Sequence, residues 1–272
     1  MQNFSTSPKE LIASIWRNRS LIQSLTQRDV IGRYRGSFFG ILWSFFNPVL
    51  MLLVYTFVFS VVFKARWSAD SDSKTEFALV LFAGLIVFNF FAECVSRAPN
   101  IILSNTNYVK KVVFPLEILP VVVMGSAVFH ASISILVWLL AYSFLFGVPH
   151  VTVFMLPLIL VPLLFLVIGL SWILAALGVY IRDISQFVGV IVTILMFLSP
   201  IFYPAKSLPN DFQILLLLNP LTTFIEDMRN LLFFGVGLDL FQITRQYIIS
   251  LLVAYVGFVW FQKTRKGFAD VL

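Results

Sequence analysis

Residues 153–180, VFMLPLILVPLLFLVIGLSWILAALGVY, decide the fold, because they continue beyond the length of one membrane crossing without a charged side chain. An α-helix needs about 20 apolar residues to cross the hydrocarbon core of a bilayer. Only 12% of the chain is charged and 60% is hydrophobic, whereas about a quarter of the residues in a soluble domain are charged. The sequence therefore predicts an all-α integral membrane protein.

Five other apolar stretches resemble this one in composition. The third of the six stretches, residues 114–146, is longer than one crossing requires, so its first turns are expected to lie outside the lipid core. Together they predict six transmembrane helices, at about 38–63, 77–95, 114–146, 153–180, 184–202 and 247–261. They divide the chain into a lead-in of residues 1–36, a transmembrane domain of residues 37–263 and a tail of residues 264–272.

Residues 203–246, between the last two predicted spans, do not read as a plain loop. They hold two short apolar pieces, Phe212–Leu218 and Leu221–Val236, separated by Asn219-Pro220. Apolar pieces of this length are more often re-entrant or interfacial than spanning, and such backbone survives at membrane depth only where protein or water covers it. We predict two short helices within 204–246 that dip back into the outer leaflet.

The lead-in carries apolar residues at three- and four-residue spacing across residues 9–35, with basic residues between them. This pattern predicts an amphipathic helix, and a basic helix with Trp16 on its apolar side suits a membrane surface. The alternative is a packed helix within a cytoplasmic domain. The sequence offers no such domain, so the membrane surface is favoured.

Gly32, Gly36 and Gly40 join the lead-in to the first span at four-residue spacing. On a helix they would share one face and allow another helix to approach closely. Alternatively, the segment is an elbow that positions the surface helix against a cytoplasmic partner. The spacing leaves both interpretations open.

The formal charge of +6 is explained by where the lysines and arginines lie. With the N-terminus placed inside, the inside segments hold most of the 19 basic residues, as the positive-inside rule requires. Both termini are therefore predicted to be cytoplasmic. No long basic run interleaves with aromatic residues, so nucleic acid is not an expected partner.

Several kinds of chemistry are excluded by what the sequence lacks. There is no G-x-x-x-x-G-K-[ST] motif for a nucleotide, and His130 and His150 have no metal-ligand spacing. The single Cys94 excludes an internal disulfide and is predicted to be a small core residue. We expect no catalytic residue, no metal site and no cofactor bound by this chain.

Glu93, Glu117 and His130 lie in or near predicted spans. Ionisable groups at such positions tend to face the interior of a bundle. A proton relay is one interpretation, but three scattered groups without a ladder between them fit hydrogen-bonded interior residues better.

Two other classes of membrane protein compete with a simple pore. A secondary transporter would show internal repeats, and none is evident between residues 1–136 and 137–272. A membrane-embedded sugar transferase would show clustered acids in an outer loop. Among Asp211, Glu226, Asp227 and Asp239, the only adjacent pair is Glu226-Asp227.

Five motifs in order along the chain resemble the permease subunit of type-2 ABC exporters of polysaccharides. They are Gln27-Arg-Asp-Val30 with Arg33 to Trp43 and Asn47-Pro48; Asn105 to Pro120; Val179 to Ile184; Leu198 to Pro204; and Leu218 to Leu221 with Arg229. The resemblance implies two copies of this non-catalytic chain, two copies of a separate P-loop ATPase that binds ATP and Mg²⁺, and a lipid-linked glycan such as O-antigen, capsule or teichoic acid. A bacterial inner-membrane location follows from it, and a drug or small-lipid exporter is the alternative within the class.

The resemblance also implies roles for particular residues. Spacing alone leaves Asn105–Leu119 as either a lipid-anchoring loop or a helix that docks into another subunit. By resemblance the ATPase-coupling residues are Asn105, Tyr108, Val109, Lys110, Lys111, Phe114, Pro115, Arg182 and Asp183. Those of the interface helix and elbow are Arg28, Asp29, Arg33, Tyr34, Arg35, Gly36 and Gly40. Those of the channel and periplasmic gate are Trp67, Pro200, Phe202, Tyr203, Pro204, Asn219, Pro220 and Arg229.

Overall fold

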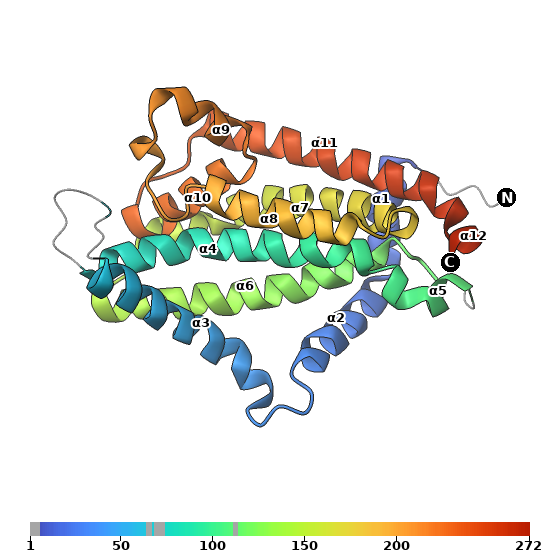
Figure 1. Ribbon diagram of the computed structural model, residues 1–272, viewed down its shortest axis with the longest axis horizontal. Helices are drawn as coiled ribbons and strands as arrows, with labels where there is room; N and C mark the ends of the chain where they lie inside the picture. Colours follow the sequence, from blue (N-terminus) through green and yellow to red (C-terminus); the bar gives the residue numbers. More distant parts are fainter. Residues whose placement is uncertain (1–5, 64–66, 68–73, 111–113) are drawn as a thin grey trace.

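A computed structural model describes residues 6–63, 67, 74–110 and 114–272, and these described residues contain helices and no strand. The long helices lie side by side along the longest axis (Figure 1). The short helices α1 (Pro8–Arg17), α5 (Thr106–Lys110) and α12 (Phe268–Val271) gather at one end, which we call the terminus end. The opposite end, which carries the connection 199–212, is the loop end. The prediction of an all-α membrane protein is confirmed.

Five helical stretches of the described chain are long and apolar enough to cross a bilayer. They contain α3 (Trp43–Tyr55), α4 (Lys74–Arg97), α6 (Ile118–Leu145), α7 (Leu156–Tyr180) and α11 (Leu240–Thr264). The π-helical turn η2 (Thr56–Val62) continues α3. Shorter elements are η1 (Gly40–Leu42), η3 (Ala98–Asn100), η4 (Leu103–Asn105), η5 (Val151–Met155), η6 (Ala205–Ser207), η7 (Asn210–Phe212), η8 (Asn230–Phe234) and η9 (Arg265–Gly267).

The fifth predicted span, 184–202, is a shorter helix in the structure. Helix α8 (Ile184–Leu198) has 15 residues, which at about 1.5 Å per residue is roughly 22 Å, less than the ~30 Å of a hydrocarbon core. Ser199 is extended, with φ −75° and ψ 145°, because the residue before a proline is disfavoured in the helical region. Pro200 therefore ends the helix four residues before the predicted boundary.

The last span is longer than the predicted 247–261, because polar residues at its start are paired rather than solvated. Asp239 caps the helix by accepting a hydrogen bond from the Phe241 amide. Gln242 and Gln246 then donate to the carboxylate of Asp227, at 2.9 and 2.7 Å. Gln242 and Gln246 lower the hydropathy of this segment, so hydropathy alone does not predict a membrane helix there. In the structure both side-chain amides are hydrogen-bonded within the protein.

The two short helices predicted before the last span are α9 (Gln213–Leu218) and α10 (Leu221–Arg229). Asn219 separates them and is buried. Its side-chain oxygen accepts the Leu221 amide at 2.9 Å, and its amide donates to the Ser199 hydroxyl at 2.8 Å. The break at Asn219-Pro220 is thus held against the end of α8, while the insertion of α9 and α10 into a leaflet stays a prediction.

The lead-in forms two helices rather than one. Helix α1 ends at Arg17, and α2 (Arg19–Arg33) begins beyond Asn18. The lead-in also packs against protein: Leu25 belongs to a buried cluster with Trp172 and Phe258. Ile12 and Trp16 stay 69% exposed, so an apolar surface suited to a membrane interface remains beside the packed face.

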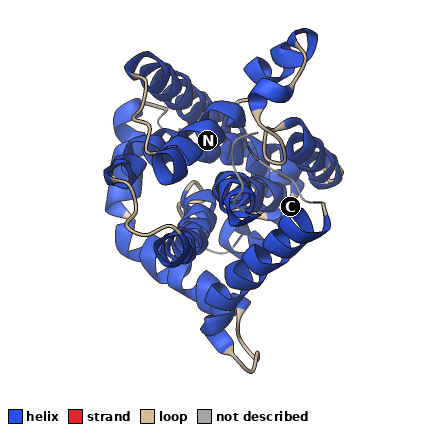
Figure 2. Cartoon of the chain, turned by 90° about the vertical axis from the view of Figure 1, so that its left-hand side faces the viewer, coloured by secondary structure: helices blue, strands red, loops and turns tan. Residues whose placement is uncertain are grey.

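The three glycines of the elbow do not share a helical face, which contradicts the close-packing interpretation. Gly36 and Gly40 have φ of 83° and 51°, the left-handed region that glycine occupies readily. A Cβ added at Gly32, Gly36 or Gly40 would meet nothing within 4 Å. The segment is a turn at the apex of a V formed by α2 and α3, which projects from the bundle (Figure 1); Figure 2 shows the bundle end-on.

Helices α7 and α11 pack with their backbones almost in contact. A Cβ added at Gly169 would lie 2.5 Å from the Val253 carbonyl oxygen, and one at Gly257 would lie 2.2 Å from the Gly169 oxygen. Small residues at a helix contact let backbones touch, which is the favoured packing mode where lipid supplies no hydrophobic driving force. Cys94 is buried in the core, as predicted.

Candidate functional site

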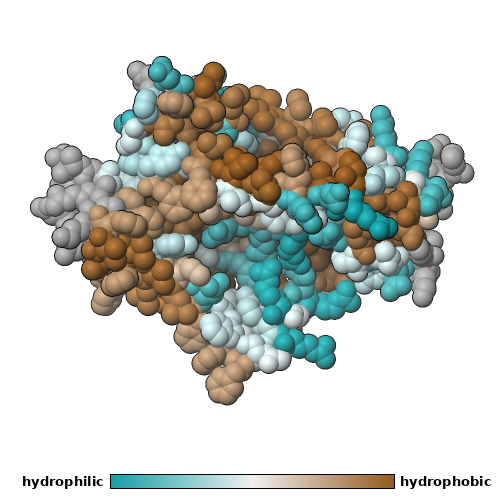
Figure 3. Space-filling model, viewed as in Figure 1, coloured by the Kyte–Doolittle hydropathy of each residue, from teal (hydrophilic) through white to brown (hydrophobic). Residues whose placement is uncertain are grey.

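A cleft of about 670 Å³ opens at the terminus end between α2, the end of α4, η4, α5 and the start of α6. Hydrophilic side chains gather over α2 and the adjoining end of α4, flanked by apolar surface (Figure 3). Its polar lining comprises Arg28, Asp29, Arg33, Ser96, Arg97, Asn100, Ser104, Asn105 and Tyr108. The cleft therefore joins residues predicted for the elbow with residues predicted for ATPase coupling.

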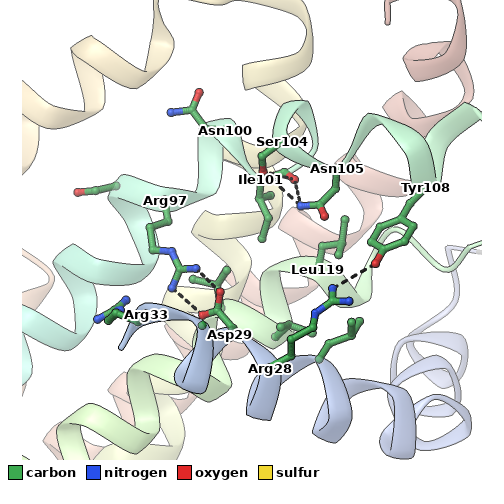
Figure 4. Close-up of a pocket in the computed structure, with 15 residues that line it drawn as sticks. Arg28, Asp29, Arg33, Arg97, Asn100, Ile101, Ser104, Asn105, Tyr108 and Leu119 are labelled. Atoms are coloured by element: carbon green, nitrogen blue, oxygen red, sulfur yellow. Dashed lines mark hydrogen bonds and ion pairs between the residues drawn. The ribbon is translucent and has the colours of Figure 1, made fainter. Parts of the chain in front are cut away.

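Asp29 and Arg97 connect α2 to α4 across the cleft. The two guanidinium nitrogens of Arg97 donate to the two carboxylate oxygens of Asp29 at 2.7 and 3.0 Å (Figure 4). Burial raises the pKa of Asp29, but hydrogen bonds from Arg97 and Ser126 outweigh it and hold the pKa below the ordinary 3.8. Bidentate pairs of this kind fix geometry as well as charge.

A second network ties the end of α2 to both α4 and α6. Arg33 forms an ion pair with Glu93, and Glu93 lies 3.3 Å from the His130 ring nitrogen. Tyr34 meets the other ring nitrogen of His130 at 3.1 Å, and Arg97 approaches Glu93 at 3.5 Å. Glu93 and His130 are thus neighbours inside one hydrogen-bonded cluster rather than scattered groups.

Arg28 links α2 to the predicted coupling segment. Its guanidinium donates to the Tyr108 hydroxyl at 3.2 Å, and the Tyr108 ring stacks on Phe114 with centroids 4.3 Å apart. Phe114 is buried while Arg28 is exposed. Tyr108 therefore faces α2, whereas Asn107 on the same short helix is exposed.

The rest of the predicted coupling segment is compact. The Asn105 amide donates to the Ile101 carbonyl at 2.9 Å and to the Ser104 hydroxyl. Val109 and Pro115 are half-buried. Lys111 lies outside the described residues, and for Lys110 the description covers the backbone alone.

Glu117 lies apart from Glu93 and His130, at a junction between distant chain segments. One of its carboxylate oxygens accepts from the Ser14 hydroxyl at 2.7 Å, and the other accepts from Arg265 at 2.6 Å. Arg265 also donates to the Phe114 carbonyl at 2.7 Å, and the Trp172 indole donates to the Glu117 carbonyl. The junction joins α1, the residues after α5 and the C-terminal end of α11.

Arg182 and Asp183 do not line the cleft. Both are exposed in the turn between α7 and α8. The turn is held near the end of α4, because Gly178 packs so tightly on the Pro99 carbonyl that an added Cβ would lie 1.9 Å from its oxygen.

At the loop end, Arg229 occupies a different kind of site. Its side chain is 1% exposed and donates to the carbonyls of Val80, Pro200 and Ile201. Its guanidinium carbon lies 4.4 Å from the centre of the Trp67 ring. Arg229 therefore holds α10 to α4 and to the end of α8.

The other predicted gate residues surround this contact. Phe202 stacks on Phe59 with centroids 6.1 Å apart, and the Tyr203 hydroxyl donates back to the Leu198 carbonyl at 3.1 Å. Pro204 is half-buried and Pro220 is exposed. Within the described ranges no group of three or more His, Cys, Asp or Glu side chains could hold a metal ion.

Sequence reasoning missed Arg97, Arg265 and Ser14 as members of these networks. Each pairs with a residue far away in the chain: Arg97 lies 68 positions from Asp29, and Arg265 lies 148 positions from Glu117. No local pattern signals such pairs. The charged residues near the ends of the spans indicate that each needs a partner of opposite charge, but their positions in the sequence do not identify that partner.

Comparison with known proteins agrees with the architecture. The family model of the ABC-2 type transporter matches residues 20–233. The O-antigen export system permease protein RfbA of Myxococcus xanthus is 29% identical over 265 residues, 96% of this chain and 98% of that protein. RfbA of Klebsiella pneumoniae is 28% identical over 256 residues, 93% and 95% of the two chains. The polysialic acid transport protein KpsM of Escherichia coli is 23% identical over 254 residues, 90% and 93% of the two chains. With most of its length matched by the family model, the chain belongs to the ABC-2 type transporter family, as its motifs predicted.

Proposed function

We propose that this chain is the permease subunit of an ATP-driven exporter that moves a lipid-linked polysaccharide across a bacterial inner membrane. The observation that carries the proposal is similarity over at least 90% of the chain to permeases named for O-antigen and polysialic acid export. The multi-pass helical bundle suits a transport subunit. ATP and Mg²⁺ would be bound by a separate ATPase, present with the permease in two copies each.

The terminus end would face the cytoplasm and contact that ATPase. The distribution of basic residues favours this orientation. Helix α5, whose Asn107 is exposed, and the exposed Arg182-Asp183 turn are the projecting features at this end that suit a partner surface. Through Arg28, Asp29 and Arg33, motion of α5 or α2 would reach α4 and α6.

The loop end would form the periplasmic gate. Helices α9 and α10 together are too short to cross a bilayer, and Arg229 anchors α10 to α4 and α8. Two copies of the chain would enclose the path of the glycan between them. Trp67, Phe202 and Tyr203 would lie beside that path at its outer end.

Co-expression with the ATPase and reconstitution into vesicles test the proposal. We expect the two proteins to co-purify and to export a lipid-linked glycan only with ATP. Transport driven by an ion gradient without the ATPase, or sugar transfer by the chain alone, would contradict it. Glutamate at both Lys110 and Lys111 should abolish assembly or export, and unchanged export would overturn the coupling assignment.

A further inference from the structure

We propose that the terminus-end cleft is a binding site for a phosphate group, carried either by a lipid headgroup at the membrane surface or by a small soluble phosphate. The site would be formed by Arg28 on α2 and by polar groups of η4 and α5. It would be distinct from the protein contacts made by the exposed side of α5.

The charges of the cleft favour an anion. Its lining carries three arginines and one acid, Asp29. Arg97 uses both guanidinium nitrogens on Asp29, and Arg33 is paired with Glu93, which adds a further negative charge nearby. Arg28 is exposed, and its interaction in the described part of the chain is with the neutral hydroxyl of Tyr108. One guanidinium is therefore held at the cleft without a carboxylate.

The geometry around Arg28 suits a phosphate. A guanidinium presents a planar set of N–H donors that matches phosphate oxygens. Asn105 and Tyr108 lie on the facing wall (Figure 4), and the Ser104 hydroxyl adjoins the Asn105 amide at 3.2 Å. These neutral groups can complete the hydrogen bonding of an oxyanion whose charge Arg28 balances.

The position and size of the cleft agree with a headgroup. The cleft lies where α4 ends, beside the lead-in. The exposed Ile12 and Trp16 of the lead-in suit an amphipathic helix at a membrane surface. Its volume of about 670 Å³ far exceeds the volume of one water molecule. Leu25, Leu119 and Val122 give it an apolar floor.

Binding is measured with the full-length permease in a neutral detergent. Native mass spectrometry compares dioleoyl phosphatidic acid with dioleoylglycerol, which has the same acyl chains but no phosphate. Calorimetry with inorganic pyrophosphate tests the soluble source. We expect phosphatidic acid to bind, dioleoylglycerol not to bind, and added salt to weaken the interaction.

Arg28→Gln should weaken phosphatidic acid binding by roughly 10- to 100-fold, because it removes a hydrogen bond between charged groups. Arg28→Lys should lie between wild type and Gln, because it keeps the charge and loses the planar donors. The matched control is Arg19→Gln, an exposed arginine of the same helix that stacks on Trp16 outside the cleft. It should stay within about two-fold of wild type. Thermal unfolding checks that each variant is folded.

The outcomes separate the sources. Pyrophosphate binding that is lost in Arg28→Gln would support the site with a soluble ligand, and phosphatidic acid binding lost in the same variant would support a lipid. Equal effects of Arg28→Gln and Arg19→Gln would overturn the proposal, and so would a wild-type chain that binds neither probe, which would leave the cleft to a protein partner. Neither ATP nor glycan enters the measurement, so its result is independent of the export function.

Discussion

Replacement of Arg229 by methionine should destabilise the folded chain by about 3–5 kcal/mol, because buried backbone carbonyls would lose their donor, at roughly 1–3 kcal/mol each. The side chain is 1% exposed. Its Nε lies 3.0 Å from the Val80 oxygen and one terminal nitrogen lies 2.8 Å from the Ile201 oxygen, with a further bond to Pro200. Methionine would leave three backbone carbonyls without this donor and remove the cation from the face of Trp67.

The magnitude follows from these contacts. The Pro200 and Ile201 carbonyls lie outside a helix, so each would be left without a donor at a cost of about 1–3 kcal/mol. The Val80 carbonyl keeps its bond within α4, and relief of the buried guanidinium's desolvation offsets part of the sum. For a chain of this size a change of 1 kcal/mol moves the melting temperature by roughly 2–4 °C. We therefore expect a fall on the order of 10 °C.

The assay is thermal unfolding of the full-length chain in detergent, followed by tryptophan fluorescence. Arg245→Gln is the control, because Arg245 is an exposed arginine on the neighbouring α11. Arg229→Lys should melt between the two, since an ammonium has three donors but no planar fork. Equal melting temperatures for Arg229→Met and Arg245→Gln would refute the reasoning and show that water satisfies these carbonyls.

Three shorter predictions concern the other end and the core. Gly178→Ala should destabilise the chain by about 2 kcal/mol, because its Cβ would lie 1.9 Å from the Pro99 oxygen; Gly189→Ala, which meets nothing within 4 Å, should not. Because the pKa of Asp29 is lowered on folding, its ion pair should stabilise the chain above pH 3.8, and this stabilisation should be lost as the pH falls below that value; Asp29→Asn should therefore unfold more easily than wild type at pH 7 but equally at low pH. Cys94, 1% exposed, should resist a maleimide until the chain is unfolded, and rapid labelling of the folded chain would contradict its place in the core.

The sequence predicted the spans best where nothing but hydrophobicity decides them. Residues 153–180 required a helix, and α7 lies there. Its boundaries are set by length and by the charged turn that follows. Prediction was weakest for α11, where Gln242 and Gln246 look too polar for lipid but pair with Asp227. Such pairing depends on tertiary contacts, which periodicity does not encode.

The candidate site was predictable in its parts but not in its assembly. Arg28, Asp29 and Tyr108 were identified from their motifs, while their partners lie tens of residues away. The glycine spacing was misleading, because i, i+4 spacing has meaning only within a helix, and the positive φ of Gly36 and Gly40 shows that the helix ends before them. A local pattern could not reveal where the helix stops.

Two ion pairs and one hydrogen bond at the terminus end constrain how α2 can move. Asp29 to Arg97 and Arg33 to Glu93 attach α2 to α4 at neighbouring points, and Tyr34 to His130 attaches it to α6. Asp29, Arg97 and Glu93 are only partly exposed, so breaking either ion pair leaves a charge incompletely paired, which is costly away from water. If α2 moved while all three contacts were kept, α4 and α6 would have to move with it. Because Gly36 and Gly40 have positive φ and nothing packed on them, the elbow is where the backbone angles can change at least cost when α2 moves together with α4 and α6.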